Sequence, residues 1–207
     1  MENHECKVIV VRHGKKESLG FGTTSWSLQS CLTDEGKETA RQVYRNLAGE
    51  LKGCRIFFCS PLWRAQQTVF EVMKASGIPP EKFDLYIHYH PGLWSGNPAV
   101  WYDGCPPEEY CNARIYKAKP AEVEAEGSRV FTAVKDAVRF AQQSADDIAT
   151  PTVFAVSHSG PLDSAIMLAR RALGQPCAIS DLAEGQGAIF VFRGNTLVRV
   201  ENVLCNA

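Results

Sequence analysis

The feature that most constrains this fold is a short apolar run that ends in a basic pair. The run 7–11 carries Val8-Ile9-Val10-Val11, and Arg12, His13 and Gly14 follow directly. An apolar run of this length predicts a buried strand. In open α/β sheets, ligands bind beyond the carboxyl ends of the strands, so Arg12 and His13 lie where a functional site is expected.

Further apolar runs alternate with helical patterns along the chain. Strands are predicted at 55–60, 83–89, 152–156, 188–193 and 196–203. Helices are predicted from 33 to 51, from 60 through 73, at 121–143 and at 162–173. This alternation predicts an α/β three-layer sandwich, with helices on both faces of a mostly parallel central sheet and an antiparallel edge. We expect residues 1–207 to form one domain, because the chain is long enough for one core and no linker divides it.

Two helix starts have recognisable caps. Thr33 is a plausible N-cap, and two acidic residues follow it at the positive end of the helix dipole. Ser60 is predicted as a cap with Pro61 as the first helical residue, which places Arg64 in the first turn. The segment 91–120 is irregular, and long irregular segments inside a domain tend to be functional loops.

Composition and charge exclude several classes of protein. The net charge of −1 gives no electrostatic reason to expect nucleic acid or an acidic membrane as the main partner. No apolar run approaches the roughly 18 residues of a membrane span, and the N-terminus has no signal-peptide core. The expected location is therefore the cytoplasm.

The cysteines and histidines do not form a recognisable metal pattern. The eight cysteines are scattered, and in a cytoplasmic chain we expect them to be reduced thiols. His88 and His90 precede Cys105 and Cys111, but this spacing fits no common structural zinc site. They are interpreted as ordinary loop residues, and no metal or other cofactor is predicted.

Three predicted strand-to-helix junctions carry basic or imidazole groups: Arg12-His13, Arg64 and His158. In a parallel sheet these junctions lie at one edge, so the side chains are expected to converge. Arginine forks match phosphate oxygens, and an imidazole among them can attack phosphorus in line. The chain has no phosphate-binding Gly-x-x-x-x-Gly-Lys-Ser/Thr loop and no obvious carboxylate set for magnesium, so its own cations would hold the phosphate.

Four motifs together resemble one known family. Val-Arg-His-Gly at 11–14, Leu-Thr-Asp-Glu-Gly at 32–36, Ser-Pro-Leu-Trp-Arg-Ala-Gln-Gln-Thr at 60–68 and Ser-His-Ser-Gly at 157–160 are similar to the histidine phosphatase superfamily, in its phosphoglycerate-mutase-like branch. The resemblance covers about residues 7–200. It implies that His13 becomes phosphorylated and that the other basic groups of the three junctions form the phosphate pocket.

A finer resemblance concerns Pro91-Gly92-Leu93-Trp94 and the stretch 157–164. Both look like the phosphatase domains of T-cell-signalling suppressors and insect steroid-phosphate phosphatases, which implies a phosphotyrosine-like or other aryl or steroid phosphate ester as substrate. In these relatives an acidic residue after the Pro-Gly-Leu-aromatic stretch protonates the leaving oxygen, but here the position is Ser95. A serine is too weak an acid for this role.

Other residues are candidates for the missing acid and for substrate binding. The same loop carries Asp103, Glu108 and Glu109, which either replace the acid or are solvated carboxylates. Gly14, Lys15 and Ser159 are candidates for binding substrate. Lys15 and Lys16 either extend the positive rim or are solvated loop lysines. Trp94, Trp101 and Tyr102 form either an apolar wall for the substrate or packing beneath the loop.

Three functional hypotheses remain at this point. The first is a metal-independent phosphomonoester hydrolase that works through a phosphohistidine and acts on a phosphorylated small molecule or a phosphotyrosine-like ester. The second is phosphoryl transfer of the phosphoglycerate-mutase type. The third is a catalytically weak protein that binds phosphate ligands. The sequence predicts no oligomeric state.

Overall fold

β1 lies near the centre of a single six-stranded sheet in the computed structural model, which describes residues 5–17, 30–94, 98–101, 111–144 and 151–203. The strand order is β3-β2-β4-β1-β5-β6. The strands are β1 (Glu5–Arg12), β2 (Ile56–Cys59), β3 (Ile87–Tyr89), β4 (Thr152–Ser157), β5 (Gly187–Arg193) and β6 (Thr196–Val203). β1 to β4 run parallel to one another, whereas β5 pairs antiparallel with both β1 and β6.

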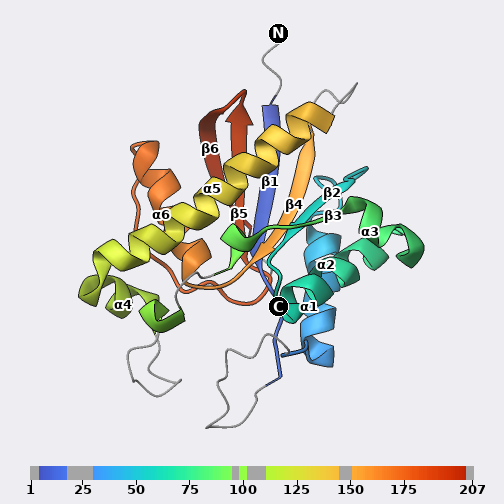
Figure 1. Cartoon of the computed structure of the whole chain (residues 1–207), viewed down its shortest axis with the longest axis horizontal. Coiled ribbons are helices and arrows are strands. Elements are labelled where there is room, and N and C mark those ends of the chain that lie inside the picture. The colour runs from blue at the N-terminus through green and yellow to red at the C-terminus, as the bar shows by residue number, and fades with distance from the viewer. Residues whose placement is uncertain (1–4, 18–29, 95–97, 102–110, 145–150, 204–207) are drawn as a thin grey trace.

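Helices cover both faces of this sheet. Side chains alternate along β1, so Val8 and Val10 point to one face while Ile9 and Val11 point to the other. The first face packs against α5 (Pro120–Ser144) and α6 (Pro161–Ala172), and the second against α1 (Asp34–Asn46) and α2 (Trp63–Ala75). Figure 1 shows α5 crossing in front of the sheet. The predicted α/β sandwich with its antiparallel edge is confirmed.

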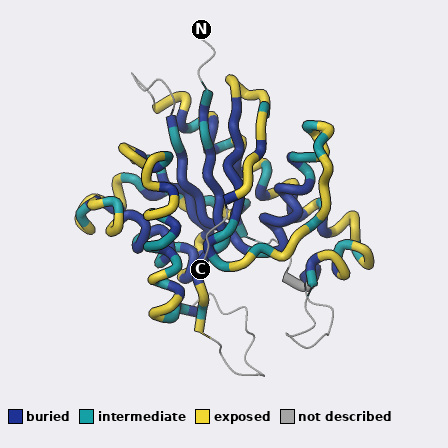
Figure 2. The backbone as a smooth tube through the Cα atoms, turned by 180° about the vertical axis from the view of Figure 1, so that it is seen from behind, coloured by how far each residue is buried: buried dark blue, intermediate teal, exposed yellow. Residues whose placement is uncertain are grey.

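The burial pattern explains why the central strands are continuous apolar runs. Figure 2 shows the central strands as the dark, buried centre, whereas the outer sides of the helices and much of the edge strand β6 are exposed. Val8 to Val11 are fully buried, because helices pack on both faces of β1. The prediction of a buried strand is therefore confirmed for the run that ends at Arg12.

The boundaries of two elements differ from the predictions. α2 begins at Trp63 with Leu62 as its N-cap, so Pro61 is not its first helical residue. Ser60 does accept a hydrogen bond from the Leu62 backbone N–H at 3.3 Å, but this bond shapes the turn before the helix. Thr33 caps α1 as predicted, since its side chain accepts from the backbone N–H of Gly36.

The predicted strand 83–89 is only partly a strand. Residues Phe83–Tyr86 form the short helix α3, after a 3₁₀ turn at Pro80–Lys82, and β3 is confined to Ile87–Tyr89. The Phe83 ring stacks on Phe70 of α2 with a centroid distance of 5.4 Å. This packing of a buried aromatic residue outweighs the alternating pattern that predicted a strand.

The described part of the segment 91–120 has more regular structure than predicted. Its described part contains 3₁₀ turns at Pro91–Leu93 and Pro98–Trp101, followed by α4 (Asn112–Ala118), and α5 begins at Pro120. Within the described ranges, every helix is too short or too polar to cross a membrane.

Candidate active site

His13 lies immediately after the carboxyl end of β1, in a turn that α1 and α2 enclose. Its backbone N–H donates to the Ser157 carbonyl at 3.1 Å, which continues the pairing of β1 with β4. The next residue, Gly14, donates its N–H to Thr68 Oγ1 at 3.1 Å. A Cβ on Gly14 would meet the carbonyl oxygen of Gly36 at 2.2 Å, so only glycine allows this approach to α1.

The hydrogen bonds of His13 define its tautomer. The Nε–H of Arg64 donates to His13 Nε2 at 3.1 Å, and a guanidinium has no acceptor, so Nε2 must be unprotonated. The proton therefore resides on Nδ1, which donates to the Gly14 carbonyl at 2.7 Å. Burial, followed by the charge of Arg64, holds the pKa of His13 well below its ordinary value. His13 is thus a neutral imidazole whose Nε2 lone pair faces a cation.

Arg64 is the second residue of α2, and its side chain is buried. Its Nη1 is buried and has no hydrogen-bond partner within the residues that the structure describes. Burial and the nearby charge of Arg12 lower the pKa of Arg64 to about 10. The guanidinium therefore stays charged at neutral pH, with a donor that is free for an anion.

His158 follows the carboxyl end of β4, and its ring meets that of His13 edge-on with centroids 5.0 Å apart. His158 Nε2 lies 2.8 Å from Ser60 Oγ, which already accepts from the backbone N–H of Leu62. The Ser60 hydroxyl can donate or accept in this second bond, and we assign it as the donor to Nε2. With this assignment the proton of His158 resides on Nδ1, which is buried and has no partner among the described residues. Burial, then the charges of His13 and Arg64, lowers the pKa of His158.

Arg12 completes the group of basic side chains. Its Nη1 donates to the Leu182 carbonyl, and its Nη2 pairs with Glu184 at 3.0 Å. Its Nε is buried, and no described residue is its hydrogen-bond partner. Arg12 is therefore held at one end of its guanidinium and has a free donor at the other.

The structure thus brings together Arg12, His13, Arg64 and His158 as the sequence predicted. Within the described part of the chain, three buried nitrogens near the neutral His13 ring have no hydrogen-bond partner, one each on Arg12, Arg64 and His158. Buried donors normally have partners, so unpartnered ones beside two guanidinium groups indicate a site for an anion with several oxygens.

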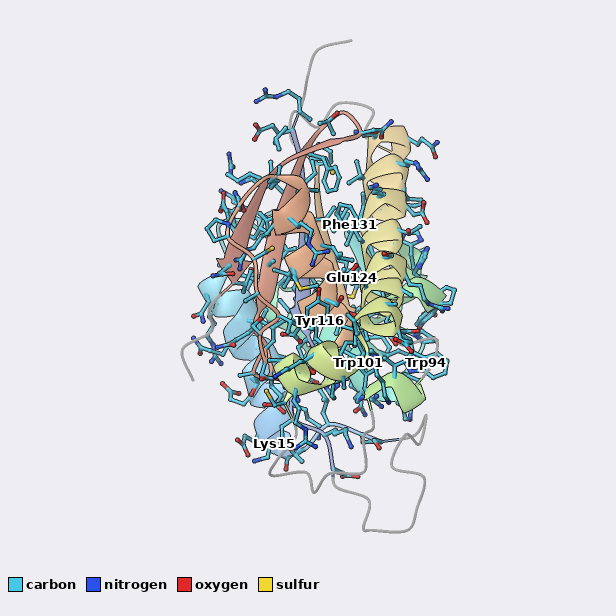
Figure 3. All side chains as sticks on the ribbon, turned by 90° about the vertical axis from the view of Figure 1, so that its left-hand side faces the viewer. Lys15, Trp94, Trp101, Tyr116, Glu124 and Phe131 are labelled. Atoms are coloured by element: carbon cyan, nitrogen blue, oxygen red, sulfur yellow. The ribbon has the colours of Figure 1, made fainter. Side chains whose placement is uncertain are left out.

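The predicted substrate-binding residues differ in their positions. Lys15 is exposed and pairs with Glu35 at 2.6 Å, and Figure 3 shows it at the lower edge of the molecule. Lys16 is nearer the site, since burial followed by the charges of Arg64 and Arg12 lowers its pKa. Ser159 donates to Asp163 at 3.1 Å.

Of the three predicted aromatic residues, Trp94 and Trp101 lie within the described part of the chain. Trp101 is buried in a cluster with Val100, Ile115 and Val123, so it serves as packing beneath the loop. Figure 3 shows it beside α4, and Trp94 beyond it. Tyr102, Ser95 and the predicted acids Asp103, Glu108 and Glu109 lie outside the described residues.

His88 and His90, which were considered above as zinc ligands, contact other side chains. His88 packs on Phe140, with ring centroids 4.2 Å apart, and His90 lies 3.4 Å from an Asp136 oxygen. Cys105 lies outside the described residues, and Cys111 donates to Asp181 at 3.4 Å. No group of three or more His, Cys, Asp or Glu that could hold a metal occurs in the described ranges.

Three residues around the site were not predicted. Ser60 was expected to cap a helix, but it bonds to His158. Glu184 lies in a segment without periodicity, and its contact with Arg12 spans 172 positions, so no local pattern indicates it. Asp163 lies within the stretch 157–164, and the resemblance of that stretch to known phosphatases is the signal that could have indicated this residue.

Comparison with known proteins agrees with this geometry. The model of the histidine phosphatase superfamily (branch 1) matches residues 8–183, so the chain belongs to that superfamily. It is similar to phosphoserine phosphatase 1 of Hydrogenobacter thermophilus, with 28% identity over 157 residues, which is 75% of this chain and 72% of that protein.

Two solved structures illustrate the shared fold. A phosphoglycerate mutase of Bacillus anthracis superposes with a TM-score of 0.60 at 18% identity, covering 98% of this chain and 94% of the mutase. A phosphoserine phosphatase of Entamoeba histolytica in complex with 3-phosphoglyceric acid gives a TM-score of 0.58 at 18% identity, covering 93% and 94% of the two chains.

Proposed function

We propose that this chain is a metal-independent phosphomonoester hydrolase that works through a phosphohistidine at His13. The observation that carries the proposal is the neutral state of His13, whose Nε2 lone pair lies beside Arg64 rather than beside a carboxylate. A neutral imidazole is a nucleophile, whereas an imidazolium is not.

In the proposed reaction, phosphate oxygens replace His13 as the partner of Arg64 and take the free donors of Arg12 and His158. The Nε2–P bond forms while the bond from phosphorus to the ester oxygen breaks, and the leaving oxygen takes up a proton from a loop carboxylic acid or from solvent. Water then attacks the phosphohistidine and gives a proton back to that carboxylate or to solvent, which restores neutral His13 and releases inorganic phosphate. The two guanidinium groups supply the positive charge for the transferring phosphoryl group.

The hydrogen bond from His13 Nδ1 to the Gly14 carbonyl supports the first step. It fixes the ring orientation and keeps the proton away from the attacking nitrogen. As Nε2 gains a bond to phosphorus, the ring becomes positive, and the Gly14 carbonyl stabilises that charge through the same hydrogen bond.

The substrate is proposed to be a small phosphate ester, with aryl-type esters favoured. The position that carries the acid in the resembled subgroup is Ser95, and an aryl oxygen needs less protonation on leaving than an alkyl oxygen does. The similarity to phosphoserine phosphatase 1 supports small phosphorylated molecules as a class. The subgroup resemblance, with its phosphotyrosine-like and steroid substrates, stays a prediction.

The test measures hydrolysis of para-nitrophenyl phosphate by the wild-type protein and by His13→Ala, each with and without a chelator. We expect turnover by the wild type that the chelator leaves unchanged, and loss of nearly all of it in the variant. Full activity of His13→Ala, or loss of wild-type activity in chelator, contradicts the proposal. Transfer of phosphate within phosphoglycerate would select a mutase instead, and vanadate binding without turnover on any ester would select a phosphate-binding protein.

A further inference from the structure

Asp163 is a buried carboxylate near the start of α6, and it lies in none of the positions that the proposed reaction uses. Its side chain is 1% exposed. Its Oδ2 accepts from the backbone N–H of Gly160 at 2.8 Å, from Ser159 Oγ at 3.1 Å and from Asn112 Nδ2 at 3.1 Å. These bonds fix the turn that directly follows His158 and join it to the start of α4.

The other oxygen of Asp163 bonds in a different direction. Oδ1 accepts from the backbone N–H of Leu182 at 2.9 Å and from Ser180 Oγ at 3.1 Å. A carboxylate that served only to cap α6 would need no partner in the segment 180–182. This second set of bonds therefore calls for another explanation.

Leu182 connects this second set to the phosphate pocket. Its N–H donates to Asp163, while its carbonyl accepts from Arg12 Nη1. Two residues later, Glu184 pairs with Arg12 Nη2 at 3.0 Å. A backbone hydrogen bond also joins this segment to Arg12, since the Gly185 N–H donates to the Arg12 carbonyl at 3.0 Å. A single residue, Leu182, thus links the Asp163 carboxylate to the guanidinium.

We infer that Asp163 is a positioning residue that fixes both Arg12 and the turn after His158. Its Oδ1 holds the segment 180–182, which binds Arg12, and its Oδ2 holds the turn. The inference rests on the proposed function only in taking Arg12 and His158 as phosphate ligands. A buried ionised acceptor with several donors holds them more firmly than a neutral one does. Replacing the Asp163 carboxylate with a neutral group should therefore make the Arg12 side chain less firmly held, although Asp163 does not contact Arg12 directly.

The test measures the dissociation constant of vanadate, a phosphate mimic, for the wild type and for Asp163→Asn. An amide must turn its NH₂ group toward donors on one side or the other, so some bonds are lost in either orientation. We expect vanadate affinity to fall by roughly tenfold or more, as for loss of a hydrogen bond to a charged group. Unchanged affinity in folded Asp163→Asn overturns the inference.

Glu71→Gln is the matched control. Glu71 is also a buried carboxylate with cationic donors, Arg41 at 2.7 Å and Lys74 at 3.0 Å, but those partners lie on the outer sides of α1 and α2. We expect Glu71→Gln to lower the melting temperature while leaving vanadate affinity unchanged. An equal loss of affinity in both variants would show that Asp163 acts through general stability, which also overturns the inference.

A double-mutant cycle tests the route through Arg12. If Asp163 acts by positioning Arg12, Asp163→Asn should weaken vanadate binding much less in an Arg12→Ala background than in the wild type. The same fold-change in both backgrounds contradicts that route.

Ser180→Ala is the variant to use if Asp163→Asn does not fold, because it removes one donor from Oδ1 and leaves the bond from Gly160 intact. We expect a small loss of vanadate affinity in Ser180→Ala, and no loss contradicts the inference. Vanadate binding needs no turnover, so failure of the hydrolase proposal would be seen separately.

Discussion

The Nε–H of Arg64 donates to Nε2 of His13 across 3.1 Å, and both side chains are buried. This bond places a cation at the atom that the proposed chemistry uses as nucleophile. It also directs the guanidinium fork toward any phosphoryl group that approaches Nε2, so Arg64 can bind the transferring group without moving far.

Arg64→Lys tests whether the fork matters beyond its charge. Lysine keeps a positive charge but lacks the planar set of donors that reaches two oxygens at once. We expect kcat/KM for para-nitrophenyl phosphate to fall about 10²–10³-fold, the usual cost of removing one oriented donor at a developing charge. Arg41→Lys, on the outer part of α1, is the control and should leave kcat/KM unchanged; an equal effect of both variants would refute this role.

Ser60→Ala tests the tautomer of His158. Without the hydroxyl, Nε2 loses its donor, and the ring gains freedom to carry its proton on either nitrogen. We expect nitrogen NMR shifts of His158 to move from the Nδ1-protonated form toward a mixture, with kcat reduced by about tenfold. Cys59→Ala, one residue earlier and also buried, should leave those shifts in place. A wild-type spectrum with the proton on Nε2 would contradict the assignment.

The depressed pKa of His13 predicts a loss of stability in acid. The unfolded chain binds a proton on this histidine below about its ordinary value of 6.5, while the buried folded form does not, so stability is present above that pH and falls as the pH is lowered through it. Each such histidine contributes a slope that approaches about 1.4 kcal/mol per pH unit well below pH 6.5. His13→Gln should therefore flatten the dependence of the unfolding free energy on pH by about 1 kcal/mol between about pH 6.5 and 5.5. Parallel curves for variant and wild type in urea titrations would show that His13 titrates normally in the folded protein.

The choice of leaving group tests the missing acid. If Asp103, Glu108 or Glu109 protonates the leaving oxygen, its amide variant should lose about 10²–10⁴-fold in rate on alkyl phosphates and far less on para-nitrophenyl phosphate. Glu50→Gln, whose carboxylate pairs with Lys7 at the other end of β1, is the control. If all three amide variants keep the leaving-group dependence of the wild type, the loop carboxylates have no such role.

The four basic residues were predictable because strand runs and helix patterns are local signals. Parallel strands end at one edge, so Arg12, His13, Arg64 and His158 had to approach one another once the sheet was correct. The start of α2 was misplaced because Ser60 has a tertiary partner, His158, that the helix-start pattern does not include. The contacts of Arg12 with the segment 182–184 arise from a loop without periodicity, so local patterns gave no sign of them.

The same reasoning explains the error at 83–89. The alternating pattern is real only at Ile87–Tyr89, whereas Phe83 belongs to a helical turn that packs on α2. Four residues are too few to show a helical period, so a strand pattern prevailed.

The most direct test of the central claim is chemical trapping of the phosphoenzyme. The protein is mixed with a radiolabelled phosphate ester, quenched with base, and digested for mass spectrometry. We expect label on His13 at Nε2, lost on treatment with acid and absent from His13→Ala. No covalent label on a wild type that hydrolyses the ester, or label that persists in His13→Ala, would contradict the account.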